Sequence, residues 1–335
     1  MFFRILIFII VLGISSALLQ FFSPLTGGFG VPQKEQKVFS DDITIGWVGD
    51  MVPAKDAEYN HAAFSFVNTE LQKPDLMIGN LEGTFALEHR TSKCIYIATR
   101  CHAFRGDESF ADALKNSGFD LVSLINNHSY DYGTDGLKDT LAILDARGIP
   151  YIAPTKPTIS LLVKGKRIGI LGLSSTQPLQ TINDYEFITT TITTLKAEND
   201  FVIVVFHGGT EGSDKTLVPG VNEYMGTENR GNVELVAHTA INAGADMVLG
   251  SGPHVLRKIE TYKNKTIAYS LGNFVGGNGN LTTTGILGHS GIFTSTLSDQ
   301  RPQQTNFISV LLTKNGTPTL DILDHGKKLI ESLSQ

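Results

Sequence analysis

This chain of 335 residues has no excess of positive charge and very little cysteine. Its formal net charge is −6, whereas a nucleic-acid-binding protein normally turns a basic face toward the phosphates. We therefore expect no nucleic-acid partner, although an anionic ligand is still allowed because a bound metal ion inverts the local charge. Charged residues make up 18% and hydrophobic residues 41% of the chain, which is typical of a globular protein and excludes a disordered one.

The two cysteines, Cys94 and Cys101, are separated by six residues. In an exported domain such a pair forms a disulfide that closes a local hairpin or loop, and two free thiols are the alternative. We expect the disulfide, because the N-terminal segment described next indicates export. A cysteine-based zinc site is not expected, because there is no second cysteine pair and His102 alone does not replace one.

The N-terminus carries a long apolar run. After Arg4, residues 5–22 form a stretch of 18 uncharged residues, and a helix needs about 17–25 apolar residues to cross a bilayer. Arg4 on the short leading side favours a cytoplasmic N-terminus. We therefore predict a membrane anchor or signal segment at 1–24, a linker at 25–40, and a single-pass cell-membrane protein whose C-terminal domain is extracytoplasmic. A signal peptide cleaved near residues 15–17 is the alternative.

Residues 41–335 alternate short apolar runs with amphipathic stretches and contain no obvious linker, so we predict one domain. Helix-like stretches at 107–117, 136–147 and 232–243 are each followed by glycine, a common helix terminator. Strands that alternate with helices of this length predict an α/β fold around a buried sheet with substantial parallel character. Residues 276–300, rich in Gly, Thr and Ser, are predicted to be a mobile loop, and residues 307–312 and 318–323 a closing hairpin.

Polar side chains that bind metals follow five of the predicted strands. In open α/β sheets, ligands bind at the carboxyl ends of the strands, because the loops converge there. Each residue alone is a weak signal; a histidine after an apolar strand is more often a buried structural residue. Five strands that all end this way indicate one site, and its candidate members are Asp50, Glu82, Asn127, His128, His207 and His254.

The mixture of these side chains fits a divalent metal. Imidazoles and carboxylates are the usual ligands of Zn, Mn or Fe, and an asparagine oxygen adds a neutral donor. Two ions about 3.5–4 Å apart would activate water against a phosphoryl or carbonyl centre. We therefore expect a cofactor of one or two divalent ions, Mn, Zn or Fe. Without metal, two carboxylates gathered at one place would repel each other, and this repulsion would raise a pKa.

Six motifs follow one another in the order 49–51, 79–83, 126–133, 206–209, 244–256 and 269–275. Together they resemble the bacterial capsule synthesis family of the CapA type, which is tied to poly-γ-glutamate capsule production. That family looks like a branch of the calcineurin-like metallophosphatase superfamily. The resemblance therefore implies a layered α/β/α sandwich with a dinuclear metal site at the strand ends.

The resemblance also implies a role for each matching residue. Its metal ligands would be Asp50, Glu82, Asn127, His207 and His254. His128 would work beside the metal as general acid or base, with Asp131 assisting, and Glu211 and Asn273 would lie on the substrate side. From its position three residues after His254, Arg257 is a better candidate than Arg230 to meet an anionic substrate; a solvated surface charge is the alternative for both.

The sequence departs from the phosphatase pattern at three places. The first phosphatase motif is Asp-x-His, but here the second residue after Asp50 is Val52. The aspartate that bridges two metals in phosphatases is replaced by Asn80 or Glu82, and the final motif, residues 251–254, has one histidine fewer. One of the two metal sites is therefore expected to be weak or absent.

Three functions are consistent with these features. The first is a metal-dependent hydrolase or transferase that acts on a γ-glutamyl polymer or another cell-envelope substrate. The second is a non-catalytic subunit of a polymer export complex, which binds an anionic polymer together with other capsule synthesis subunits. The third is a membrane-anchored phosphoesterase. The absent histidines favour the binding protein, whereas the retention of Asp50, His128, His207 and His254 favours an enzyme.

Overall fold

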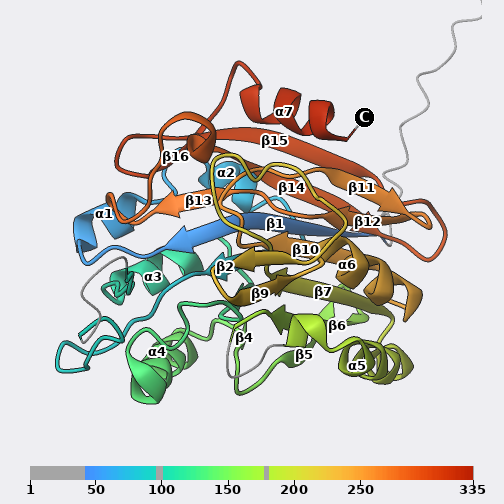
Figure 1. Ribbon diagram of the computed structural model, residues 1–335, viewed down its shortest axis with the longest axis horizontal. Coiled ribbons are helices and arrows are strands. Elements are labelled where there is room, and N and C mark those ends of the chain that lie inside the picture. The colour runs from blue at the N-terminus through green and yellow to red at the C-terminus, as the bar shows by residue number, and fades with distance from the viewer. Residues whose placement is uncertain (1–41, 96–100, 177–180, 335) are drawn as a thin grey trace, which may run out of the picture. The chain divides into compact units, whose positions relative to one another are not determined.

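The computed structural model describes residues 42–95, 101–176 and 181–334, and its elements form one compact unit (Figure 1). The strands are β1 (Ile43–Val52), β2 (Leu76–Leu81), β3 (Leu121–Ser123), β4 (Tyr151–Ile152), β5 (Thr158–Val163), β6 (Lys166–Ser174), β7 (Phe201–His207), β8 (Glu223–Met225), β9 (Glu228–Gly231), β10 (Met247–Ser251), β11 (Ile259–Tyr262), β12 (Lys265–Ala268), β13 (Asn273–Gly276), β14 (His289–Leu297), β15 (Thr305–Leu312) and β16 (Pro318–Leu320). The helices are α1 (Ala57–Ala62), α2 (Asn68–Leu71), α3 (Ser109–Asn116), α4 (Gly133–Ala146), α5 (Tyr185–Glu198), α6 (Val233–Asn242) and α7 (His325–Leu333), with short 3₁₀ turns at Thr181–Asn183 and Gly285–Gly288.

The strands form two large mixed sheets. The first has eight strands in the order β16-β15-β14-β1-β2-β3-β4, with β13 paired to β1 outside that path. Here β1 to β4 run parallel, and β14 to β16 add antiparallel pairs. The second has six strands in the order β11-β12-β10-β7-β6-β5, of which β12, β10, β7 and β6 are parallel. A separate hairpin pairs β8 with β9.

The two sheets pack face to face around a shared apolar core. Ile45 and Trp47 of β1 lie in one cluster with Ile170 of β6, Val205 of β7 and Leu249 of β10. Strands buried on both faces read as continuous apolar runs, which explains why β7 and β10 show no alternation of polar and apolar residues. This packing brings the carboxyl ends of parallel strands from both sheets together.

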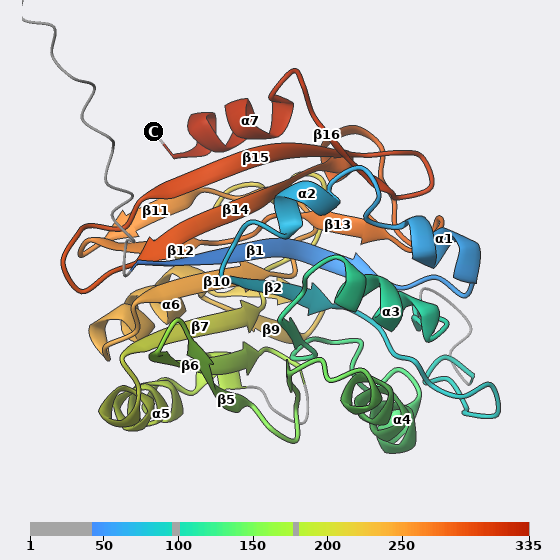
Figure 2. The same ribbon diagram turned by 180° about the vertical axis from the view of Figure 1, so that it is seen from behind.

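Helices cover the outer faces of the sandwich, with α3 and α4 on one side and α5 and α6 on the other in both views (Figures 1 and 2). The sequence of α6 explains why it packs against a sheet, since its buried residues recur at the helical spacing that makes one apolar face. Asn232 caps this helix, because its side chain accepts a hydrogen bond from the backbone N–H of Leu235. The layers of the sandwich are thus helices, sheet, sheet and helices.

The structure confirms the α/β class but corrects the single buried sheet that a three-layered α/β/α sandwich implies, because the strands are divided between two sheets. The three predicted helices are confirmed as α3, α4 and α6, and the closing hairpin as β15 and β16. The predicted mobile loop at 276–300 is wrong in its second half, since His289–Leu297 forms β14 between β1 and β15. β14 is a core strand despite its many small polar residues, because the side chains of Ile292 and Phe293 are fully buried.

The predicted membrane segment at 1–24 and linker at 25–40 lie outside the described residues. Within the described part of the chain, none of the helices combines the length and the apolar character that a bilayer crossing requires.

Candidate metal centre

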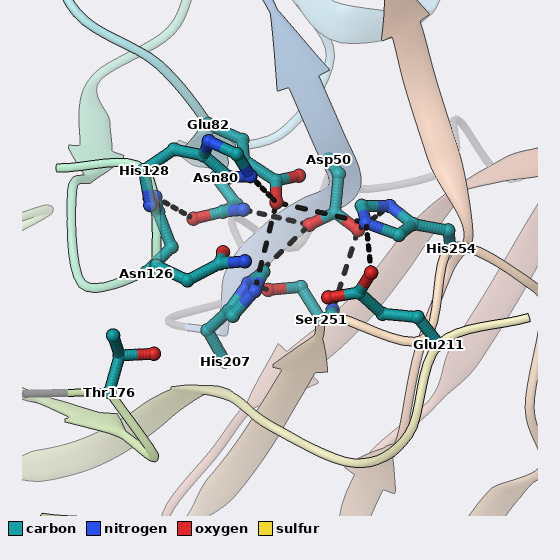
Figure 3. A network of polar contacts seen from close by, with 12 residues as sticks. Asp50, Asn80, Glu82, Asn126, His128, Thr176, His207, Glu211, Ser251 and His254 are labelled. Atoms are coloured by element: carbon teal, nitrogen blue, oxygen red, sulfur yellow. Dashed lines mark hydrogen bonds and ion pairs between the residues drawn. The ribbon is translucent and has the colours of Figure 1, made fainter. Parts of the chain in front are cut away.

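The site lies where strands of both sheets end (Figure 3). Asp50 lies near the end of β1, and Glu82 directly follows β2. His207 is the last residue of β7, and His254 follows β10 by three residues. Asp50, Glu82 and His207 are at most 1% exposed. Two sheets therefore supply one buried cluster of carboxylates and imidazoles.

Local backbone geometry explains the position of Asp50. A Cβ atom at Gly49 would lie 1.9 Å from the carbonyl oxygen of Gly272, so only glycine allows this close approach. The N–H of Asp50 then donates to the same oxygen at 2.9 Å. The pairing of β1 shifts register at Asp50 with both β2 and β13, and such an irregularity re-aims a side chain near a site.

The side chain of Glu82 lies close to three imidazoles but forms no hydrogen bond with the described residues. Neither of its buried carboxylate oxygens has a hydrogen-bond partner among the described residues. Its Oε1 lies 3.7 Å from the Nε2 of His207 and 3.8 Å from the Nε2 atoms of His128 and His254. Two ligand atoms that each lie about 2.1 Å from one ion are at most about 4.2 Å apart. The spacing therefore fits atoms that converge on a cation.

Each of these three imidazoles also makes a polar contact through Nδ1, the ring nitrogen that does not face Glu82. A metal-binding histidine typically uses its other ring nitrogen for an outer hydrogen bond, which fixes the orientation of the ring. In this site the Nδ1 atoms make that contact: His128 with Asp131 Oδ2 at 2.8 Å, His207 with Ser251 Oγ at 3.1 Å and His254 with Asn273 Oδ1 at 2.8 Å. The three Nε2 atoms are left to face inward.

Two asparagines, Asn80 and Asn126, lie against the cluster. The amide of Asn80 donates to Asp50 Oδ1 at 2.7 Å and accepts from the amide of Asn126 at 3.0 Å. Sequence reasoning missed Asn126, which also donates to the carbonyl oxygen of Leu81 and so joins the loop after β3 to the end of β2. The predicted ligand Asn127 has a buried Oδ1 with no hydrogen-bond partner among the described residues. Asn127 therefore stays a predicted ligand.

Burial and charge set the protonation of the metal-free cluster. Burial, reinforced by repulsion from Asp50, raises the pKa of Glu82 well above its usual range. Burial alone would raise the pKa of Asp50 too, but the hydrogen bond and charge of His254 lower it. Burial alone would lower the pKa of His254, yet Glu82, Asp50 and Glu211 raise it to about 10. Without metal, a proton on His254 therefore offsets the carboxylate charge.

His254 also has unusual backbone geometry. Its φ of 60° lies in the left-handed region, which costs a non-glycine residue about 1–2 kcal/mol. In this conformation both ring nitrogens of His254 make contacts. Nδ1 lies 3.1 Å from Asp50 Oδ2, and Nε2 faces Glu82. Strain at such a position is typical of functional sites.

His128 and Asp131 form a buried dyad at the edge of the cluster. Burial lowers the pKa of His128, and the adjacent Asp131 only partly opposes this effect. Since Asp131 accepts a hydrogen bond from Nδ1, the neutral ring has its unprotonated nitrogen at Nε2. That arrangement suits a general base.

A cavity of about 290 Å³ opens beside the cluster. His128 and His254 contribute to its wall, as do the predicted substrate-side residues Glu211 and Asn273. His102 lines it as well, although the sequence offers no signal for this residue because it follows no apolar strand. The remaining lining residues include Phe104 and residues 280–282 and 287, so the segment after β13 covers part of the cavity.

The prediction that Arg257 meets a substrate is wrong. Its side chain is fully buried, and its guanidinium forms two hydrogen bonds with the carboxylate of Glu223, at 2.8 and 2.6 Å. Arg230 lies closer to the centre: it pairs with Glu211 at 3.2 Å and donates to the carbonyl oxygen of Gly209. Position in sequence could not reveal that the 210–223 segment folds over Arg257.

We expect Arg257→Met to affect folding rather than ligand binding. Removing one partner of a buried ion pair leaves the other charge uncompensated, here Glu223, and costs about 3–5 kcal/mol. Urea denaturation of the metal-loaded protein measures this loss. The double variant Arg257→Met/Glu223→Gln should recover part of it, and a fully stable single variant would contradict the structural role.

Asp50, Glu82 and His254 offer ligand atoms that all lie within 4.8 Å of one another. Together with His207 Nε2, which lies 3.7 Å from Glu82 and has no hydrogen-bond partner among the described residues, they make a mixed nitrogen and oxygen donor set suited to Zn, Mn or Fe. The residues present therefore fit a divalent ion.

Cys94 and Cys101 form a disulfide in the structure, with Cα atoms 5.5 Å apart. His102 and Phe104, which line the cavity, follow directly after it.

The fold of this chain belongs to a phosphatase-like α/β class. A crystal structure described as a novel phosphatase from Mycoplasma pneumoniae superposes with a TM-score of 0.51 at 14% identity, covering 81% of this chain and 94% of that one. At this identity, the similarity concerns the fold.

The family follows from the sequence match. The model of the bacterial capsule synthesis protein family PGA_cap matches residues 39–278, and this chain belongs to that family. The capsule biosynthesis protein CapA of Bacillus anthracis is 27% identical over 267 residues, 70% of this chain and 60% of its own length. The PGA biosynthesis protein CapA of Bacillus subtilis is 29% identical over 266 residues, 71% of this chain and 65% of its own. The chain thus spans less than two thirds of either relative.

Proposed function

We propose that this protein is a metal-dependent hydrolase of the cell envelope that cleaves a γ-glutamyl polymer. The observation that carries the proposal is the carboxylate of Glu82, buried without a hydrogen-bond partner among the described residues and facing three imidazole nitrogens. A buried carboxylate without hydrogen bonds is costly unless a cation compensates its charge. The choice of polymer rests on the PGA biosynthesis named for the Bacillus subtilis relative.

The proposed ligands are Asp50, Glu82, Asn127, His207 and His254. When bound, a divalent ion supplies a Lewis acid that polarises a substrate carbonyl and lowers the pKa of water. One ion is favoured over two, because the amide of Asn80 is already used by Asp50 and Asn126 and is not a bridging carboxylate.

The protein's own groups would move the protons. His128 Nε2, at the cavity wall, would take a proton from the attacking water and return it to the leaving amine nitrogen. Asp131 would hold the ring and stabilise its protonated form. Glu211 and Asn273, which line the same cavity, would orient the chain of the polymer.

The proposed location is the outer face of the cell membrane, with residues 1–24 as anchor. The uncharged run at residues 5–22 supports it, and so does the Cys94–Cys101 disulfide, a feature typical of oxidising, extracytoplasmic compartments. The anionic polymer and other capsule synthesis subunits are the proposed partners.

A binding protein without turnover is the second candidate. Its support is the neutral amide of Asn80, which hydrogen-bonds to Asp50 and brings no bridging carboxylate, and this weakens a two-metal mechanism. Such a protein would hold the anionic polymer through the ion without cleaving it.

The decisive experiment is an assay of the chain from residue 41 onward, loaded with Mn, Zn or Fe, on γ-linked glutamate oligomers and on a generic phosphodiester. Cleavage of the oligomers that disappears with a chelator is the expected result. Cleavage of the phosphodiester alone would establish a phosphoesterase instead. Binding of the oligomers without cleavage would identify the binding protein.

A further inference from the structure

Lys93, the residue before Cys94, forms one flank of the Cys94–Cys101 disulfide and contacts the His128–Asp131 dyad. The backbone N–H of Lys93 donates to the carbonyl oxygen of Asp131 at 2.7 Å. Its Nζ forms an ion pair with Asp131 Oδ1 at 2.6 Å and donates to the backbone oxygen of Asn127 at 3.2 Å. One lysine therefore contacts both the aspartate of the dyad and the residue before His128.

The other flank reaches the same aspartate through Phe104, three residues after Cys101. The N–H of Phe104 donates to Asp131 Oδ2 at 2.5 Å. Its ring lies over the imidazole of His128, with the ring centroids 4.3 Å apart. The carbonyl oxygen of Phe104 accepts from the N–H of Thr84, which ties this flank to the segment that carries Glu82.

Both oxygens of Asp131 are thus occupied by the flanks of the Cys94–Cys101 disulfide before His128 is considered. Asp131 is fully buried, so it has no solvent contact that could replace these partners. A carboxylate held at both oxygens cannot rotate, and its hydrogen bond then fixes the plane of the imidazole.

We propose that Lys93 and Phe104, tied together by the Cys94–Cys101 disulfide, form a positioning clamp that orients His128 through Asp131. They are positioning residues, because neither is assigned a contact with the reacting atoms. The clamp rests on the proposed function only for its effect on turnover; its effect on the His128 ring stands independently.

A structural alternative is that Lys93 merely neutralises a buried carboxylate. In that case its loss would lower the free energy of unfolding but leave the imidazole in place. The two roles differ in a readout at the ring itself, the ¹⁵N chemical shifts of His128, which report which nitrogen carries the proton and how it is hydrogen-bonded.

The test compares Lys93→Met with Lys93→Arg, which retains a cation that pairs with carboxylates. Lys138→Met is the matched control, because Lys138 is an exposed lysine on α4 whose ion pair with Asp135 lies on the surface. Cys94→Ser/Cys101→Ser tests the tie between the flanks. Each variant is measured for metal content, His128 ring shifts and turnover of γ-linked glutamate oligomers.

We expect Lys93→Met to lower kcat roughly 10- to 100-fold, the usual effect of losing an outer partner of a site, with metal content retained. Its KM should change little, since the proposed loss concerns the transition state. The His128 ring shifts should move, Lys93→Arg should restore most of both properties, and the disulfide variant should show a smaller effect of the same kind.

Unchanged His128 shifts in folded Lys93→Met would overturn the clamp, as would wild-type turnover in that variant. If the wild-type protein turns over neither substrate, the proposed hydrolase fails, yet the ring shifts still decide whether the clamp exists.

Discussion

Replacing Glu82 with glutamine is expected to weaken metal binding at least about 100-fold, more than the loss of an outer partner does. Glutamine keeps the shape of the side chain but removes the carboxylate whose Oε1 faces the Nε2 atoms of His128, His207 and His254. Metal analysis after dialysis against trace Mn, Zn or Fe measures the change. The wild-type protein should retain about one ion per chain, as one complete site requires.

Glu88→Gln is the matched control, since Glu88 is an exposed carboxylate. Thermal unfolding separates lost binding from lost folding. Metal-free Glu82→Gln should be at least as stable as the metal-free wild type, because the environment of Glu82 raises its pKa and so disfavours the charged form. Metal should raise the melting temperature of the wild type only. Full metal occupancy in Glu82→Gln would refute the proposed site.

The same site predicts a pH dependence of metal affinity. In the metal-free protein, neighbouring carboxylates raise the pKa of His254 to about 10, so its ring is protonated at neutral pH. An ion reaches Nε2 only by displacing that proton, and the protonated fraction falls as pH rises. Affinity should therefore increase about tenfold per pH unit for each proton displaced, which titrations at about pH 6.5 and about pH 7.5 would measure.

The second large effect is expected for His128→Ala. Loss of a general acid or base typically lowers kcat by about 10²–10⁴-fold. Metal content should remain near that of the wild type, because Asp50, Glu82, His207 and His254 supply the proposed binding atoms. Steady-state kinetics on γ-linked glutamate oligomers, with metal analysis of the same samples, measures both properties.

His102→Ala serves as the comparison, since His102 lines the same cavity but belongs to neither the cluster nor the dyad. It should alter KM more than kcat. Loss of bound metal in His128→Ala would instead identify His128 as a ligand, and an unchanged kcat would contradict its role in proton transfer.

Several features of the fold and site follow from sequence alone. Short apolar runs that end in Asp50, Glu82 and His207 predict strands whose polar ends meet, because parallel strands place their carboxyl ends at one edge. The helices now seen as α3, α4 and α6 were predictable for a similar reason: each has a local apolar period and a following glycine. These signals depend on neighbours within a few positions, so no tertiary information is needed to read them.

Tertiary structure alone decided the rest. Sequence periodicity does not state which strands pair. It could therefore not predict the division into two sheets or the position of β14 between β1 and β15. The ion pair of Arg257 with Glu223, the hydrogen bonds of Asn126 and the place of His102 at the cavity all depend on segments distant in sequence. Polar residues have no period that reveals their partners. The sequence therefore determined which side chains stand at the strand ends, and packing decided which of them meet in one buried cluster.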